Sequence, residues 1–343
     1  MSKPINTALV GFGFSGQTFH GPFLSALEQF EVVSVLSSQP DKVKQKFPNA
    51  TVSSSLEEVL ATDVELVVIT TPNTLHFEQA KKCIEAGKHI IVEKPFMITS
   101  KEAQEIADLA EKKGVLLSVY HNRRYSDDLL TLKSLIRDGK MGELISFEGH
   151  FDRFRPEVRD RWRERDLPGS GMLYDLGSHL VDQAVQLFGR PDKVYCDSIK
   201  QRNGAQSDDY FHMVLYFGNK RAILHSSVLV PKAPSMITAH GTGGSFYAFN
   251  IDPQEAQLIA GVIPTDDSFG TRTDKGEYTD KDGVTTPLSY EKGAMVNYFK
   301  EFANAVRNGG QVPVTPKDAV TVIKIIETAA ESARRGAVID YSD

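Results

Sequence analysis

Three ionisable side chains in this sequence have types and spacing suited to moving a proton: Lys94, Asp175 and His179. Lys94 stands in the triplet Glu93-Lys94-Pro95, directly after an apolar run, and could relay a proton. Asp175 and His179 are four residues apart, so we expect both on one face at the start of a helix, with Asp175 orienting the imidazole. Each residue alone has a simpler alternative role. Lys94 could be a surface lysine paired with Glu93, Asp175 a helix cap, and His179 a packed histidine. Beside a dinucleotide site, the three predict a general acid–base group.

A glycine-rich turn near the N-terminus predicts that dinucleotide site. It follows the apolar run 5–10 and precedes a helical segment, which is the context in which this spacing of glycines binds a pyrophosphate. Gly11 allows the tight turn, Gly13 the close approach of the phosphates and Gly16 the contact between helix and strand. The expected cofactor-binding residues of the turn are Gly11, Phe12, Gly13, Phe14, Ser15 and Gly16.

The end of the second expected strand indicates which dinucleotide is bound. NAD enzymes usually carry an acidic residue there, which accepts a hydrogen bond from the ribose 2′-hydroxyl. This chain has the hydroxyls of Ser37 and Ser38, with Lys42 a few residues on, and these groups suit a 2′-phosphate. The alternatives are that Ser38 only starts a turn or that Asp41 folds back onto the ribose. The pattern favours NADP.

Further cofactor contacts are expected from the loop that leaves the third expected strand, 66–70. This loop reads Thr70, Thr71, Pro72 and Asn73, and His76 follows on a helix. Pro-Asn is also an ordinary turn signal. His76 could equally contact the cofactor or serve as a capping or packing residue.

The order of elements predicts two domains. Residues 1–122 alternate apolar strands with helices, which is typical of a doubly wound parallel α/β sheet of the Rossmann type. Residues 123–343 carry strands joined by short turns, which indicates an α+β domain with a mostly antiparallel sheet. Residues 265–286 are polar and are expected to form a surface excursion, and a final helix is expected over 316–334.

Composition excludes several classes of protein. The formal net charge is −6, so no basic field attracts nucleic acid or an anionic membrane. No apolar run has the length of a membrane span, and the first strand begins too early for a signal peptide to precede it. The two cysteines, Cys83 and Cys196, lack disulfide or zinc-ligand spacing. We therefore expect a cytoplasmic protein with no metal site.

The motifs together resemble the glucose–fructose oxidoreductase / inositol dehydrogenase (Gfo/Idh/MocA) family, over essentially the whole chain. The segments 118–124, 155–158, 162–164 and 173–179 are most similar to its NADP-dependent scyllo-inositol 2-dehydrogenase subgroup. The resemblance implies an open-faced second sheet that builds a dimer or tetramer, and a final helix that packs back on the first domain. It also adds Glu93, Lys94, Asn122, Trp162 and Arg163 to the cofactor contacts, and assigns to the polyol pocket Arg123, Arg153, Arg155 and Tyr174.

These features lead to two hypotheses of different classes. The first is an NADP-dependent oxidoreductase acting on a secondary alcohol of a cyclitol or sugar, with a keto-sugar (anhydro-hexulose) reductase or an aldose dehydrogenase as alternatives within the family. The second is a catalytically silent NADP-binding regulatory protein. Silent relatives commonly lose the acid–base residues, and Lys94 and His179 are both present.

Overall fold

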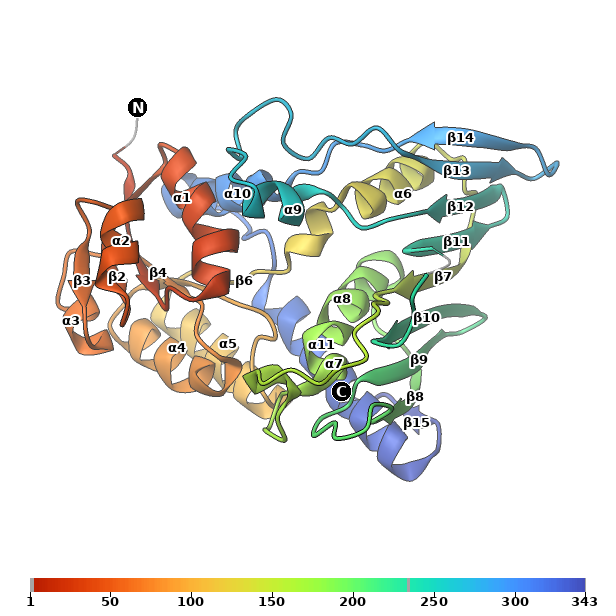
Figure 1. Ribbon diagram of the computed structural model, residues 1–343, viewed down its shortest axis with the longest axis horizontal. Coiled ribbons are helices and arrows are strands. Elements are labelled where there is room, and N and C mark those ends of the chain that lie inside the picture. The colour runs from red at the N-terminus through yellow and green to blue at the C-terminus, as the bar shows by residue number, and fades with distance from the viewer. Residues whose placement is uncertain (1–2, 233–234, 343) are drawn as a thin grey trace. The chain divides into compact units, whose positions relative to one another are not determined.

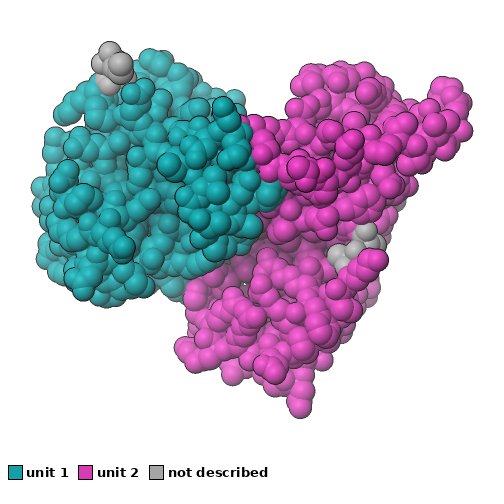
Figure 2. Space-filling model, turned by 45° about the horizontal axis from the view of Figure 1, so that its top comes forward, with its two compact units in different colours: residues 1–122, 253–270, 294–320 teal, residues 123–252, 271–293, 321–343 magenta. Residues whose placement is uncertain are grey.

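The computed structural model describes residues 3–232 and 235–342, which fall into two compact units (Figure 2). The first unit comprises the residues up to 122 together with 253–270 and 294–320, and the second comprises the other described residues. The chain passes between them after Asn122, where the strand–helix alternation ends. Segments 253–270 and 294–320, expected in the second domain, group with the first unit because an apolar helix within them completes its core.

Six parallel strands form the sheet of the first unit, in the order β3-β2-β1-β4-β5-β6 (Figure 1). Their short apolar runs, buried on both faces, are typical of parallel strands covered by helices. The strands are β1 (Ile5–Val10), β2 (Phe30–Leu36), β3 (Thr51–Ser53), β4 (Leu66–Ile69), β5 (His89–Val92) and β6 (Leu117–Val119). The order reverses between β1 and β4, and ligands bind at the carboxyl ends of strands at such a point.

Local signals in the sequence set several helix ends in the first unit. Ser55 caps α3 by accepting a hydrogen bond from the Glu58 amide, and Gly114 ends α5 in the left-handed conformation at φ 66°. Thr99 and Glu102 form a reciprocal capping box at the start of α5. The helices are η1 (Gly16–His20), α1 (Gly21–Ala26), α2 (Pro40–Lys46), α3 (Leu56–Leu60), η2 (Asn73–Leu75), α4 (His76–Glu85), α5 (Ser100–Lys113), α9 (Gln254–Ile259) and α10 (Met295–Asn308).

Helix α10 supplies aromatic side chains to the core of the first unit. Phe299 stacks on Phe23 of α1 with ring centroids 4.9 Å apart. Tyr298 donates a hydrogen bond to Ser118 in β6 at 2.9 Å, so its buried hydroxyl is satisfied. These contacts explain why a segment far from residue 122 in sequence belongs to the first unit.

The second unit contains a nine-stranded mixed sheet in the order β14-β13-β12-β11-β7-β10-β9-β8-β15 (Figure 1). β7 and β10 are parallel, and the other pairs are antiparallel. The strands are β7 (Leu144–His150), β8 (Lys193–Ile199), β9 (Tyr210–Phe217), β10 (Lys220–Ser227), β11 (Ile237–Gly241), β12 (Gly244–Ala248), β13 (Lys275–Asp280), β14 (Thr285–Ser289) and β15 (Ile339–Asp340). Its helices are α6 (Asp127–Arg137), η4 (Trp162–Glu164), α7 (Gly171–Asp175) and α8 (Gly177–Phe188).

The two faces of this second sheet differ. A Cβ added at Gly149 would lie 2.9 Å from Leu180 of α8, so α8 packs closely against that face. The alternate residues, which face away from α8, are half-buried, among them Tyr210, His212 and Tyr216 of β9. The predicted mostly antiparallel sheet is confirmed, with one half-polar face turned away from the helix.

Several sequence expectations need correction. Residues 265–286, expected as a surface excursion, contain β13 and part of β14; these exposed strands lack the apolar alternation that marks a half-buried strand. The final helix α11 (Pro316–Arg335) runs one residue further than predicted, and only its residues up to 320 group with the first unit. Across the described residues, no helix combines the length and apolarity that crossing a membrane demands.

Candidate functional site

The glycine turn after β1 has the geometry that a bound pyrophosphate requires. Gly11 adopts φ 95°, which side-chain-bearing residues rarely adopt, and a Cβ at Gly16 would lie 2.6 Å from the Gly11 carbonyl oxygen. A Cβ at Gly13 would meet nothing within 4 Å, so the backbone there is open to a ligand. Thr70, at the end of β4, donates a hydrogen bond to the Gly11 carbonyl at 2.7 Å and ties the turn to the neighbouring strand.

A buried carboxylate links this turn to the Glu93-Lys94-Pro95 segment. Glu93 accepts hydrogen bonds from the Ser15 hydroxyl and from the Lys94 backbone amide, and its Oε1 lies 2.9 Å from His20 Nε2. Burial alone would raise the pKa of Glu93, but the hydrogen bond and charge of His20 lead the effects that lower it to about 2. Ser15 therefore lies beside the strand end from which Lys94 emerges. Sequence reasoning missed His20, whose only signal was a histidine in the helix that follows the glycine turn.

His76 joins two loops of the first unit by its ring. Its Nδ1 lies 3.1 Å from the carbonyl oxygens of Pro95 and Phe96, and its Nε2 lies 2.9 Å from that of Thr71. The side chain is buried, and burial lowers the pKa of His76. This geometry favours the packing role over the direct cofactor contact, because both ring nitrogens already face backbone carbonyls.

The loop after β2 presents hydroxyl groups at the expected ribose end of a dinucleotide. Ser37 accepts a hydrogen bond from the Gln39 amide at 3.0 Å and keeps its own proton to donate. Ser38 is exposed, and Lys42 lies exposed in the first turns of α2. Asp41 is likewise exposed on α2.

The other first-unit residues expected at the cofactor lie in these same loops or near them. Thr71 donates to Gln79 at 2.6 Å, while Asn73 is buried at the start of η2. Asn122 is buried, and its amide lies 3.9 Å from Met295 Sδ of α10. In the glycine turn, Phe12 is buried in the core, whereas Phe14 is 60% exposed. Pro72, in the loop after β4, is also exposed.

In the second unit, Asp175 and His179 lie on two consecutive helices. Asp175 is the last residue of α7, and His179 lies in the first turn of α8, so the expected position of Asp175 at the start of one helix is corrected. Asp208 supports α7: its carboxylate accepts from the Leu173 amide at 2.7 Å. A Cβ at Gly171 would lie 1.9 Å from that carboxylate, so this close approach needs a glycine.

Asp175 forms an ion pair with a residue that the sequence assigned to the cofactor. Arg163 Nε lies 3.3 Å from Asp175 Oδ1, and the Arg163 guanidinium stacks 4.6 Å from the centre of the Trp162 ring. The structure thus brings Trp162, Arg163 and Asp175 together. It also groups Arg123 with His179, because the Phe151 ring lies 5.5 Å from the Arg123 guanidinium and 6.0 Å from the His179 ring.

The segment that carries Arg153, Arg155, Trp162 and Arg163 is mostly irregular. Its first part is held by backbone hydrogen bonds to Ser227 and Val228, and a buried side chain contacts it further on. Arg202 donates to the backbone carbonyls of Arg155 and Glu157 at 3.2 and 2.8 Å, and to Glu164 at 3.0 Å. Asp209 balances its charge, with Nε to Oδ2 at 2.8 Å. Sequence reasoning missed Arg202, because nothing in its local pattern separates it from a surface arginine.

A second buried pair fixes α8. Arg124 donates through Nε and Nη2 to Asp182 at 2.7 to 3.1 Å, and both side chains are buried. Asp182 lies one turn after His179, so the pair holds the helix that carries the imidazole. Tyr174 is half-buried on α7, and Arg153 extends the β7 edge by donating its amide to Ser227 at 2.9 Å.

The first unit thus has what a dinucleotide requires: an open glycine turn at the switch point of a parallel sheet, followed by a helix. These features define a dinucleotide-binding unit of the Rossmann type. Residues 5–121 match the model of the oxidoreductase family's NAD-binding Rossmann fold, and residues 133–340 match that of its C-terminal alpha/beta domain. The chain belongs to the Gfo/Idh/MocA oxidoreductase family, as the motifs predicted.

Individual relatives agree along the full chain. Scyllo-inositol 2-dehydrogenase (NADP(+)) IolW of Bacillus subtilis is 40% identical, over 96% of this chain and 94% of its own. Levoglucosan dehydrogenase of Pseudarthrobacter phenanthrenivorans is 25% identical over 98% of both chains. The solved structure of yvaA from Bacillus subtilis is 39% identical and has a TM-score of 0.97, with all of both chains covered.

Proposed function

We propose that this protein is an NADP-dependent oxidoreductase that interconverts a secondary alcohol and a ketone of a cyclitol or sugar, with scyllo-inositol and scyllo-inosose as the first pair to test. One observation carries the proposal: Glu93 is hydrogen-bonded to Ser15, which sets Lys94 beside the turn built for a dinucleotide. The identity of 40% to an NADP-linked scyllo-inositol dehydrogenase supports the substrate class.

In the proposed mechanism the chain positions the polyol and moves one proton. Lys94 and His179 are the groups that hold or release the hydroxyl proton, and Asp175 supports the charged imidazole. Arg163 is ion-paired with Asp175. The bound nicotinamide supplies the hydride acceptor or donor. The polyol contacts are assigned to Arg123, Arg153, Arg155 and Tyr174, since a polyol needs many donors to be preferred over water.

The preference for NADP follows from the loop after β2, where two hydroxyls stand and no carboxylate. We expect NADP(H) to bind at least about tenfold more tightly than NAD(H), a difference of about 1.4 kcal/mol. Ser37→Asp should reverse the order by repelling the 2′-phosphate, while Asp41→Asn serves as a control because Asp41 is exposed on α2. Fluorescence titration with both cofactors measures this; equal affinities in the unaltered protein contradict it.

The substrate is tested by nicotinamide absorbance with a panel of inositols, hexoses and anhydro-sugars, using both cofactors. Turnover of an inositol with NADP supports the proposal. The relative named levoglucosan dehydrogenase makes an anhydro-sugar or keto-sugar substrate the second candidate, and an aldose dehydrogenase is the third. No turnover of any alcohol, with NADP bound, would favour the silent regulatory class instead.

Assembly and location complete the proposal. Among the described residues of the second unit, no helix covers the half-buried face of the sheet (Figure 1), which favours a partner surface. We therefore infer a homodimer or homotetramer formed through the sheet around β9 and β10. Light scattering that gives a monomer of 37.9 kDa at micromolar concentration contradicts it. Cys83 and Cys196 are buried free thiols, which fits a reducing cytoplasm.

A further inference from the structure

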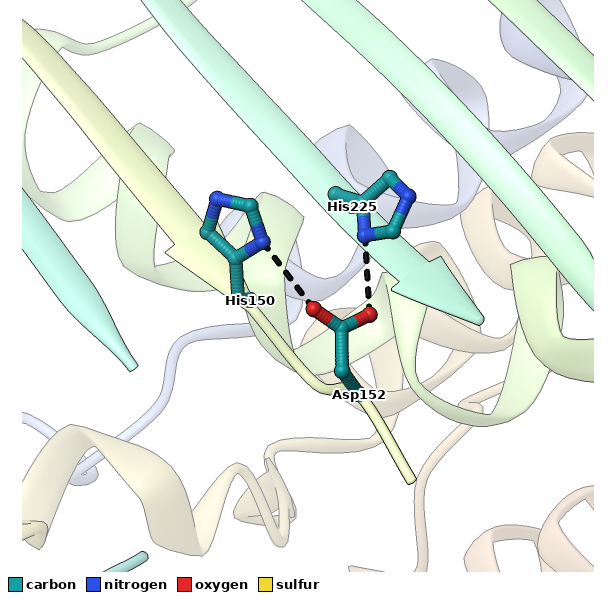
Figure 3. A group of neighbouring side chains, drawn as sticks. All are labelled: His150, Asp152 and His225. Atoms are coloured by element: carbon teal, nitrogen blue, oxygen red, sulfur yellow. Dashed lines mark hydrogen bonds and ion pairs between the residues drawn. The ribbon is translucent and has the colours of Figure 1, made fainter. Parts of the chain in front are cut away.

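Three side chains that metals favour meet on the face of the second sheet turned away from α8 (Figure 3). His150 ends β7 and is paired in register with His225 of the parallel strand β10, so both rings project from the same face. Asp152 follows His150 by two residues and projects the same way. His150 Nδ1 lies 3.2 Å from Asp152 Oδ2, and His225 Nδ1 lies 2.8 Å from Asp152 Oδ1.

We propose that His150, Asp152 and His225 bind a divalent transition-metal ion, of which Zn²⁺ is the natural probe. Imidazole nitrogens and carboxylate oxygens bind Zn²⁺ at about 2.0 to 2.2 Å, which places neighbouring tetrahedral ligands about 3.3 Å apart. One ligand atom from each of the three residues already lies within 4.8 Å of the others, so a small shift of the side chains brings all three to one ion. With the ion bound through Nδ1, each neutral imidazole would carry its proton on Nε2.

Charge and burial suit a cation at this position. The Asp152 side chain is only 2% exposed, and the Ser227 amide donates to it at 3.0 Å, so its orientation is fixed. The two rings are 16% and 17% exposed in a single chain, on the sheet face through which we infer assembly.

Neighbouring groups can complete the coordination. Three protein ligands leave a position for water, as in exchangeable zinc sites. Glu148 also lies on this face, with its Oε2 3.9 Å from His150 Nε2. The His212 ring is further away, with its centre 6.0 Å from that of His225, and stands outside the set. The sequence predicted no metal site because His225 is 73 positions from Asp152 and only the strand pairing brings them together.

The competing account is that Asp152 only orients two histidines by hydrogen bonds. The discriminating experiment uses the full chain without a histidine tag, freed of metal by a chelator. Zn²⁺ is titrated by calorimetry, and bound metal is counted per chain after dialysis. We expect one saturable Zn²⁺ per chain. Co²⁺ in its place should give ligand-field absorption bands typical of nitrogen and oxygen ligands.

Two variants and one control decide the result. His225→Asn and Asp152→Asn should each weaken Zn²⁺ binding at least about 100-fold, because each removes a direct ligand. His212→Asn, on the same face, should change it by less than about threefold. NADP titration and melting temperature establish that every variant is folded, and Asp152→Asn keeps the shape of the side chain. Absence of saturable binding in the unaltered chain, or binding that survives both substitutions, overturns the proposal.

Discussion

The glycine turn of the first unit and the arginine-rich loop of the second are both irregular segments to which we assign ligand contacts, yet they are held by different means. The turn is shaped by backbone sterics: Gly16 lies against the Gly11 carbonyl, and Thr70 bonds to the same oxygen. The loop is paired through its first residues with the backbone of Ser227 and Val228, and further on it is contacted by the buried guanidinium of Arg202, which reaches its backbone and Glu164. A short motif therefore defines the turn, whereas distant residues define the loop.

The largest effect on stability is expected where the loop is anchored. Arg202→Met leaves Asp209 buried without its charge partner, so the free energy of unfolding should fall by about 3 to 5 kcal/mol. The KM for the polyol should rise, and NADP affinity should fall as well, because the same loop carries Trp162 and Arg163, which we assign to the cofactor. Arg165→Met is the control, because the Arg165–Asp160 pair is exposed and should contribute less than about 1 kcal/mol. Denaturant unfolding measures both; equal losses would mean that Arg202 is no anchor.

In the first unit, the buried Glu93 should dominate the response to acid. Its pKa falls from an ordinary 4.5 to about 2, which corresponds to about 3 kcal/mol of stabilisation. Because the folded pKa is the lower one, this stabilisation is present above about pH 4.5 and is lost as the pH falls towards 2. Glu93→Gln should flatten the loss of stability in that interval.

The control for that experiment is Glu105→Gln, which removes an exposed carboxylate paired with Lys81 and should leave the acid response unchanged. The unfolding free energy of the unaltered protein and of both variants is measured from pH 5 to pH 2. The loss attributed to Glu93 over this interval should be on the order of 3 kcal/mol. If Glu93→Gln loses as much stability between pH 5 and pH 2 as the unaltered protein, the loss comes from other carboxylates.

The smallest effect on stability is expected at Gly13 of the turn. Comparing Gly13 with Gly16 separates an effect on folding from an effect on cofactor binding. Gly16→Ala puts a Cβ 2.6 Å from the Gly11 oxygen and should cost about 1 to 3 kcal/mol as well as NADP affinity. Gly13→Ala meets no protein atom within 4 Å, so stability should change by less than about 0.5 kcal/mol while NADP affinity falls. Thermal melts and cofactor titrations test the pair. Unchanged NADP affinity in Gly13→Ala would refute the assigned phosphate position.

The same contrast explains what the sequence could predict. The first-unit strands other than β3 follow from short apolar runs, and the Ser55 cap and the Gly114 helix end follow from local residue types. The sequence did not predict β3 (Thr51–Ser53). The His20–Glu93 bond and the Arg202 anchor join residues far apart in the chain, and no local pattern marks them. β13 and β14 escaped prediction because both are exposed and lack apolar alternation.

The central claim is that Lys94 and His179 act in one proton transfer. The most direct measurement is kcat for Lys94→Ala, His179→Ala and the double variant, with NADP and the best polyol. Each single change should lower kcat by about 10² to 10⁴-fold, and the double variant should be less than about tenfold slower than the slower single. NADP affinity should survive His179→Ala. If His179→Ala kept more than about a third of kcat, or if the two effects multiplied, the two residues would not act as one group.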